Sequence, residues 1–191
     1  MQVEEGVYAF APVLQHDEWG RWMAATLTAA GTVLSHLSAA IAWALLTIPG
    51  EFETVTRPGS GGPRRHGDVV VHRSSTLAGD VTTLQGIPIT TVPRTLLDLT
   101  TQVSDRALAR AVREAVRLDY VTLHGLGDAL GRFRGRRGVR LLGEVVSRYA
   151  GLPIARARSG AEVRAMEVIA AVGRSVPSLN VAVAVESADL S

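Results

Sequence analysis

The chain of 191 residues contains no cysteine and no lysine. Without cysteine it has no disulfide bond, thiolate metal ligand or cysteine nucleophile, and nothing in its composition indicates an oxidising compartment. We therefore expect a cytoplasmic protein. Without lysine, all 20 basic residues are arginine, and the formal net charge is +2. Exclusive use of arginine is consistent either with a GC-rich genome or with selection of guanidinium groups for phosphate contacts.

Long apolar segments and several enzyme motifs are also missing. Residues 23–48 are the most apolar stretch, but Gly31, Ser35 and His36 interrupt it, whereas a membrane-spanning helix needs about 20 consecutive apolar residues. The sequence has no GxSxG, no phosphate-binding GxxxxGK and no GxGxxG motif, and its histidines lack zinc-ligand spacing. These absences argue against a membrane protein, a serine hydrolase, a P-loop nucleotide hydrolase, a Rossmann dehydrogenase and a zinc site.

Hydrophobic residues make up 47% of the chain and charged residues 20%, which is typical of a globular protein. Their spacing predicts an α/β chain of the mixed α+β type, with a small, mostly antiparallel sheet between residues 51 and 91 packed by helices. The expected elements are a strand or hairpin arm at 3–10, helices at 18–30 and 35–46, strands at 51–56 and 68–73, two strands within 80–90, and an exposed loop at 57–68.

The phrase GIPITTVPRTLLDL, residues 86–99, is the clearest local signal. Gly86 provides a turn, and Ile87 and Ile89 lie on one face of a strand. Pro93 suits the first turn of a helix, where its missing N–H costs nothing. The phrase therefore predicts a strand followed at once by a helix.

Four residues near the two helix starts are candidates for a structural motif. Arg94 and Asp98 are four positions apart on one helix face, so we expect them to pair, and an exposed pair of this kind contributes about 0.3–0.5 kcal/mol. Ser35 is expected to cap the helix at 35–46. His36 is expected to be a structural histidine that bonds to the backbone near that helix start.

The second half of the chain is expected to be mainly helical, with a glycine-punctuated helical hairpin within 123–152. Ser159 stands three residues before Glu162, which is the spacing of a capping box at a helix start. Residues 180–190 alternate in the manner of a strand. Because that strand would expose an apolar edge, a homodimer formed through it is a hypothesis.

An arginine cluster lies in the middle of the predicted hairpin, with five arginines in nine residues and no acidic residue among them: Arg132, Arg134, Arg136, Arg137 and Arg140. Such a cluster suits contacts to phosphate and predicts salt-dependent, sequence-independent binding to DNA. The alternative is a solvated connection between two helices. Phe133 alone does not form a stacking platform for bases.

Several phrases of the sequence, taken together, resemble a known family. They are GVYAF, LSHLSAAIAWALL, DVVVHR, GIPITTVPRTLLDL, GRRG, RSGAE and SLNVAVAVESADL, in this order. The chain resembles actinobacterial proteins related to AbiEi-type antitoxins of type IV toxin–antitoxin systems, those with a Vsr-like, restriction-endonuclease-like C-terminal domain. SHLSAAIAW and GIPITTVPRTLLDL are the most specific phrases, and the resemblance spans nearly the whole chain.

The resemblance implies four parts. Residues 1–12 correspond to the remnant wing of a winged-helix domain whose preceding helices are absent. Residues 13–122 correspond to an antitoxin-like α/β middle domain, and residues 123–152 to a helical connector. Residues 153–191 correspond to an incomplete endonuclease-like domain, so the chain looks truncated at both ends.

The family's nuclease pattern has a glutamate on its first helix, an aspartate on its first long strand and a later acidic strand. Glu162 and Asp189 match the first two, and the third acid would lie beyond Ser191. Nucleases of this class hold Mg²⁺ with converging carboxylates, so we expect an incomplete metal site and little or no cleavage. Read without the family, Glu162 is a helix cap and Asp189 a solvated carboxylate at a strand end.

The resemblance and the arginine cluster favour a non-catalytic, DNA-associated transcriptional regulator or antitoxin-like protein. It would need no cofactor, and its partners would be the DNA backbone and a toxin protein. A Vsr-like, Mg²⁺-dependent DNA endonuclease, incomplete or decayed in this chain, is the alternative. A folded fragment without activity of its own is a third possibility.

Overall fold

The computed structural model describes residues 2–4, 7–8, 17–48, 50–150, 152, 160–173 and 175–176. Within these residues the chain forms one six-stranded mixed sheet, a separate two-stranded hairpin and seven helices, which confirms the mixed α+β class. The hairpin consists of β1 (Gln2–Glu4) and β2 (Val7–Tyr8), paired antiparallel. It forms in the region where the sequence predicts a hairpin arm, and its assignment to a winged-helix wing stays a prediction.

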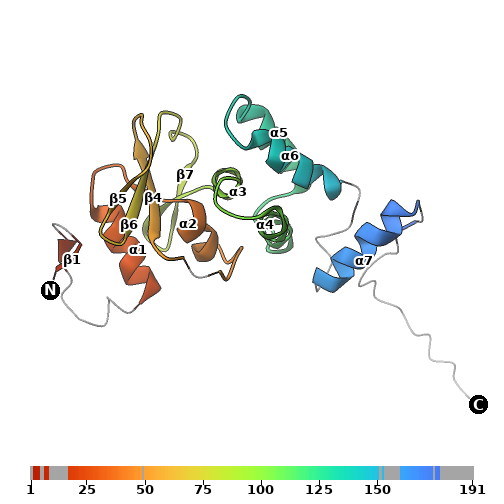
Figure 1. Cartoon of the computed structure of the whole chain (residues 1–191), viewed down its shortest axis with the longest axis horizontal. Coiled ribbons are helices and arrows are strands. Elements are labelled where there is room, and N and C mark those ends of the chain that lie inside the picture. The colour runs from red at the N-terminus through yellow and green to blue at the C-terminus, as the bar shows by residue number, and fades with distance from the viewer. Residues whose placement is uncertain are drawn as a thin grey trace, which may run out of the picture.

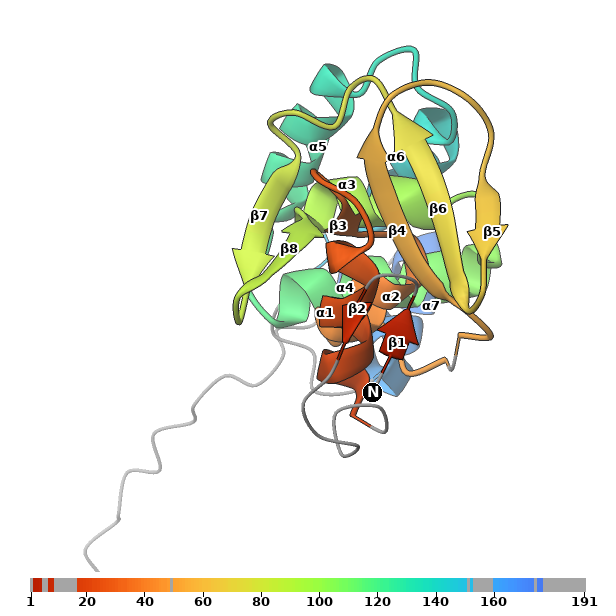
Figure 2. The same ribbon diagram turned by 90° about the vertical axis from the view of Figure 1, so that its left-hand side faces the viewer.

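The six strands of the sheet follow the order β5-β6-β4-β3-β8-β7. Their bounds are β3 (Val33–Leu34), β4 (Glu53–Pro58), β5 (Arg64–His66), β6 (Val69–Ser74), β7 (Val81–Leu84) and β8 (Ile87–Thr90). Figure 2 shows β4, β5 and β6 side by side on one side of the sheet and the β7–β8 hairpin on the other.

The sheet differs from the sequence prediction in two places. The central strand β3 was not predicted, because its two residues lie between two helices and are too short to show an alternating pattern. The segment 57–68, expected to be a loop, contains the edge strand β5. Three strand pairs are antiparallel, as expected for most of the sheet, whereas β4 with β6 and β3 with β8 are parallel.

Seven helices accompany the sheet (Figure 1). They are α1 (Glu18–Leu27), α2 (His36–Ala42), α3 (Val92–Leu99), α4 (Asp105–Arg117), α5 (Leu123–Arg132), α6 (Val139–Arg148) and α7 (Gly160–Ala171). In Figure 1 the sheet with α1 and α2 forms one end of the molecule, α3 and α4 lie in the middle, and α7 lies at the far end. The predicted helical hairpin is present as α5 and α6.

Two hydrophobic clusters meet at α2. Ala39 belongs to the cluster in which Trp22 of α1 packs on the sheet residues, whereas the adjacent Ala40 belongs to the cluster of α3 to α6. The second cluster extends from Ala40 to Met166 of α7, across the boundary expected after residue 122. The four-part division itself stays a prediction.

A glycine-rich loop, residues 59–63, carries the chain across the end of β6. Because β4 and β6 are parallel while β5 is antiparallel to β6, the loop must pass over the last residues of β6 before β5 begins. The backbone N–H of Gly59 donates to the carbonyl of Ser74 at 3.2 Å. Gly59 and Gly61 have φ values of +132° and +118°, which glycine adopts readily, so the loop lies directly against Arg73.

Some predicted features lie outside the described residues: Ser159, the strand at 180–190 with Asp189, and the dimer through that strand. In the part of the chain that the structure describes, no helix is both long and apolar enough to cross a membrane.

Candidate functional site

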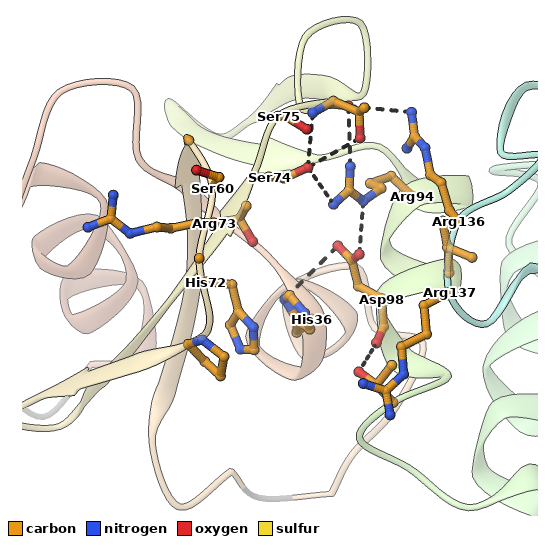
Figure 3. Close-up of a pocket in the computed structure, with 17 residues that line it drawn as sticks. His36, Ser60, His72, Arg73, Ser74, Ser75, Arg94, Asp98, Arg136 and Arg137 are labelled. Carbon is orange, nitrogen blue, oxygen red and sulfur yellow. Dashed lines mark hydrogen bonds and ion pairs between the residues drawn. The ribbon is translucent and has the colours of Figure 1, made fainter.

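A cavity of about 590 Å³ lies where the C-terminal end of β6 meets α3 and the connection between α5 and α6. Arg73, Arg94, Arg136 and Arg137 line it, together with His36, His72 and Asp98. In Figure 3 Arg136 and Arg137 lie on the side of the cavity opposite β6, with Asp98 and His36 between, while the side chain of Arg73 in β6 points away from them. The α5–α6 connection is therefore the wall that faces the sheet.

Two histidines stack at the base of this cavity. His36 begins α2 with a left-handed φ of 52°, which is uncommon for a residue with a side chain. Its ring lies 3.7 Å from the ring of His72 in β6, with an interplanar angle of 22°. The fold thus joins the phrases SHLSAAIAW and DVVVHR in one contact.

Ser35 stands at the N-cap position of α2, but its side chain does not cap the helix. The Ser35 hydroxyl lies 2.9 Å from His36 Nδ1, and it accepts a hydrogen bond from Thr56 at 2.8 Å. The capping bond comes instead from another element, since the backbone N–H of Ser38 donates to the hydroxyl of Thr54 in β4. The expected bond between His36 and the backbone is likewise replaced by the bond to Ser35.

Burial sets the charge of the histidines. It lowers the pKa of His36 to about 3, and the positive charge of Arg94 acts in the same direction. Burial also lowers the pKa of His72 to about 4, with a further decrease from His36 and opposition from Asp98. Both histidines are therefore neutral at pH 7, and the arginines supply the positive charge of the cavity.

Arg94 and Asp98 form the predicted pair, but the expectation of an exposed pair was wrong. Their side chains are 7% and 8% exposed, and Arg94 Nε donates to Asp98 Oδ1 at 2.9 Å. Arg94 Nη1 also lies 3.5 Å from Asp80 Oδ2. Burial raises the pKa of Asp98, while the charge and the hydrogen bond of Arg94 lower it. The sheet, α2 and the α5–α6 connection cover this face of α3, which the local spacing of the two residues does not reveal.

The five clustered arginines separate into different environments. Arg136 donates to Asp80 Oδ2 at 2.8 Å, and its guanidinium carbon lies 4.8 Å from the centre of the buried Phe133 ring. Arg137 is exposed and lines the cavity. Arg132 and Arg134 are exposed beside it in sequence, and Arg140 pairs along α6 with Glu144 at 3.4 Å. An acid-free stretch of sequence is thus neutralised in part by acids from other segments.

Of the two residues expected in a nuclease site, only Glu162 is within the described chain. It lies in the first turn of α7, is half-buried and does not line the cavity. Among the described residues, no group of three or more histidine, cysteine, aspartate or glutamate side chains is arranged to hold a metal ion.

Residues of the site that the sequence reading missed are His72, Arg73 and Asp80. His72 and Arg73 end the strand phrase DVVVHR, and Asp80 precedes β7, so each belongs to a segment expected to be only structural. A signal was available in the adjacent charged and polar residues at the end of an apolar strand. The segment that these residues face depends on the order of the strands in the sheet, and no local sequence pattern predicts that strand order.

The geometry argues against two kinds of acid–base site. Two histidines that transfer protons to and from a phosphodiester must flank it and have pKa values near the working pH, whereas His36 and His72 stack on each other with lowered pKa values. In a serine–histidine–aspartate site the two partners face different ring nitrogens. Here Ser35 Oγ and Asp98 Oδ2 both face His36 Nδ1, at 2.9 and 4.0 Å.

No family model matches this chain, and no curated protein matches its sequence significantly. The resemblance drawn from the sequence phrases therefore stays a prediction, and the assignment of function rests on the cavity and its arginines.

Proposed function

We propose that this protein is a non-catalytic, DNA-associated regulator of the antitoxin-like type that contacts the phosphate backbone through the arginines at the mouth of its cavity. The observation that carries the proposal is that basic side chains from two separate segments meet at the cavity. Arg94 comes from α3, and Arg136 and Arg137 come from the α5–α6 connection, whereas the guanidinium of Arg73 in β6 points away from the cavity.

The arginines differ in how far they are available to a ligand. Arg94 and Arg136 are bonded to carboxylates inside the protein. For Arg137, no acidic side chain of the described residues lies within ion-pair distance. Guanidinium groups without an internal partner bind phosphate without first breaking an ion pair. We therefore assign the backbone contacts to Arg137 and to the exposed Arg134 of the same connection.

Asp80 connects the two elements that carry these arginines. Its carboxylate bonds Arg136 and lies 3.5 Å from Arg94, so it joins the α5–α6 connection to α3. Arg137 follows Arg136 directly and is held at the cavity by the same contact. A surface fixed in this way requires little ordering when a rigid duplex binds.

The test is fluorescence anisotropy with a labelled DNA duplex at several salt concentrations. The cavity variant, Arg134→Ala/Arg137→Ala, removes the two proposed contacts of the α5–α6 connection. The matched control is Arg106→Ala/Arg110→Ala, which removes two exposed arginines of α4 that do not line the cavity. Each lost phosphate contact lowers the slope of log affinity against log salt by about 0.9, so we expect the cavity variant to lose about 1.8 of that slope.

An equal loss of affinity in both variants would mean that binding follows overall charge and would contradict the assigned surface. Repeating the measurements with Mg²⁺ and analysing the DNA on a denaturing gel tests the endonuclease alternative. We expect intact DNA, and Mg²⁺-dependent cleavage that Glu162→Gln abolishes would replace the regulator by a nuclease. A wild-type protein without affinity for DNA would overturn the proposal.

A further inference from the structure

The sheet carries a second group of basic side chains on the face opposite the cavity described above. Figures 1 and 2 show α1 on one face of the sheet and α5 and α6 on the other. Successive side chains of a strand alternate between the two faces. Thr56 and His72 line the large cavity, so the residues that follow them, Arg57 and Arg73, belong to the face of α1.

The register of the strands brings three arginines together on this face. Arg57 of β4 lies opposite Arg73 of β6, and Arg64 of β5 lies opposite Val71 of β6. No acidic side chain of the described residues is within ion-pair distance of any of the three. Like charges on neighbouring strands repel each other. A bound anion would therefore be favoured on this face.

A smaller cavity, of about 240 Å³, lies on the same face between the end of α1 and strands β4, β5 and β6. Ala29, Val69 and Val71 give it apolar walls. The polar residues that line it are Thr28, Thr32, Arg57 and His66. The half-buried Arg57 thus places one guanidinium group at an otherwise largely apolar hollow.

The hydroxyl of Thr32 is a separate observation that points to a ligand. Thr32 precedes Val33, which pairs with Thr56, so it lies beside Arg57 at the edge of this cavity. Thr32 is 3% exposed, and its Oγ1 has no hydrogen-bond partner among the described residues. A buried hydroxyl without a partner is unfavourable, and an acceptor oxygen in the cavity would remove that cost.

Charge and size together define the chemistry of the ligand. A guanidinium group binds a carboxylate through two parallel N–H···O bonds, and Arg57 has no internal carboxylate to release first. The apolar walls favour a ligand with an apolar body. Because the cavity is smaller than the range of about 300–1,000 Å³ typical of drug-sized ligands, that body has to be compact.

We propose that this cavity binds a small organic acid that consists of one carboxylate and a compact apolar body, such as an aromatic ring or a branched alkyl group. Arg57 binds the carboxylate, the Thr32 hydroxyl donates to it, and Val69 and Val71 contact the apolar body. Arg64 and Arg73 add positive charge around the entrance. The site lies on the other face of the sheet from Arg137, so the inference goes beyond the proposed DNA contact and does not rest on it.

The test is isothermal titration calorimetry in a low-salt buffer free of carboxylates and phosphate. The probes are benzoate and isovalerate, with benzamide as the uncharged analogue of benzoate, acetate as a carboxylate without the body, and inorganic phosphate. We expect at least one of the two acids to bind at least tenfold more tightly than acetate, benzamide and phosphate. Arg57→Gln should abolish that binding, and Thr32→Val should weaken it about threefold to tenfold.

The matched control for Arg57→Gln is Arg65→Gln. Arg65 lies opposite Val70, and therefore on the other face of the sheet, where it donates to the carbonyl of Gly67 and stacks on Phe52. Thermal melts without ligand provide a further readout. Because Thr32 Oγ1 has no partner, Thr32→Val should melt at or above the temperature of the wild type, and a lower melting temperature would mean that the hydroxyl makes a structural bond and would contradict its role in the site.

The remaining outcomes are equally decisive. If neither acid binds, the site is overturned. Binding of acetate or phosphate as tight as that of the better acid would show that Arg57 attracts any anion and would contradict a site for the apolar body. Equal losses in Arg57→Gln and Arg65→Gln would mean that binding follows overall charge. Affinity for DNA that is lost in Arg57→Gln, without binding of either acid, would make this face a phosphate-contact surface instead.

Discussion

Arg94 Nε and Asp98 Oδ1 lie 2.9 Å apart in a buried ion pair on α3, and this pair links the wall of the cavity to its base. Asp98 Oδ2 is 4.0 Å from His36 Nδ1, and Arg94 Nη1 is 3.5 Å from Asp80. The last residues of the phrase GIPITTVPRTLLDL form α3. This helix therefore carries the two residues through which α2, the sheet and the α5–α6 connection are held together.

Removing one partner of this pair should be costly. Arg94→Met leaves the Asp98 carboxylate buried without its main partner, and we expect a loss of about 3–5 kcal/mol in the free energy of unfolding. The double variant Arg94→Met/Asp98→Leu replaces the pair by apolar side chains and should recover most of that loss. Urea denaturation followed by tryptophan fluorescence measures both variants, and a double variant no more stable than Arg94→Met would contradict the account.

The two stacked histidines should make the protein less stable in acid. Their pKa values are lowered from 6.5 to about 3 for His36 and about 4 for His72, so the unfolded chain binds more protons than the folded one below pH 6.5. The free energy of unfolding then falls by about 1.4 kcal/mol per pH unit for each histidine, from about pH 6 down to the folded-state pKa. Asp98 acts in the opposite sense, because its raised pKa makes the folded state bind protons more readily.

The variant His36→Asn isolates the contribution of one histidine, since asparagine tolerates a left-handed φ better than most residues. Denaturation at several pH values between 4 and 7 should show a shallower fall in stability than in the wild type, by about 1.4 kcal/mol per pH unit. The same slope in both proteins would mean that His36 is not buried in its neutral form.

Two glycines of the α5–α6 connection allow the cost of a steric clash to be separated from the cost of backbone strain. Gly135 and Gly138 have φ values of +81° and +83°, but a Cβ on Gly135 would meet open space, whereas one on Gly138 would overlap the side chain of Thr100. We expect Gly135→Ala to cost about 1–2 kcal/mol from strain alone. Gly138→Ala should cost about 1–3 kcal/mol more, because Thr100 has to move.

Thermal or urea denaturation of the two alanine variants gives the comparison, and equal losses would rule out a steric role for Gly138. Adding Thr100→Ala to Gly138→Ala should restore part of the stability. Because this connection carries Arg136 and Arg137, the Gly138→Ala protein should also bind DNA more weakly than the Gly135→Ala protein.

The sequence by itself determined the elements whose signals are local. The Gln85-Gly86 turn between β7 and β8, the start of α3 at Val92 with Pro93 in its first turn, and the hairpin of α5 and α6 all follow from neighbouring residues. The pairing of Arg94 with Asp98 follows from helical spacing in the same way. Turn chemistry, proline geometry and the helical repeat act over a few residues, so they can be read without knowing the rest of the fold.

Tertiary structure alone decided the cavity. The stacking of His36 on His72 and the bond of Arg136 to Asp80 join residues 36 and 56 positions apart, and they depend on the parallel pairing of β4 with β6 and on how the α5–α6 connection packs. The same packing buries Arg94 and Asp98, which their spacing on one helix does not predict. Burial and charge in this site are set by which segments cover one another, because desolvation depends on all surrounding atoms and not on neighbours in the chain.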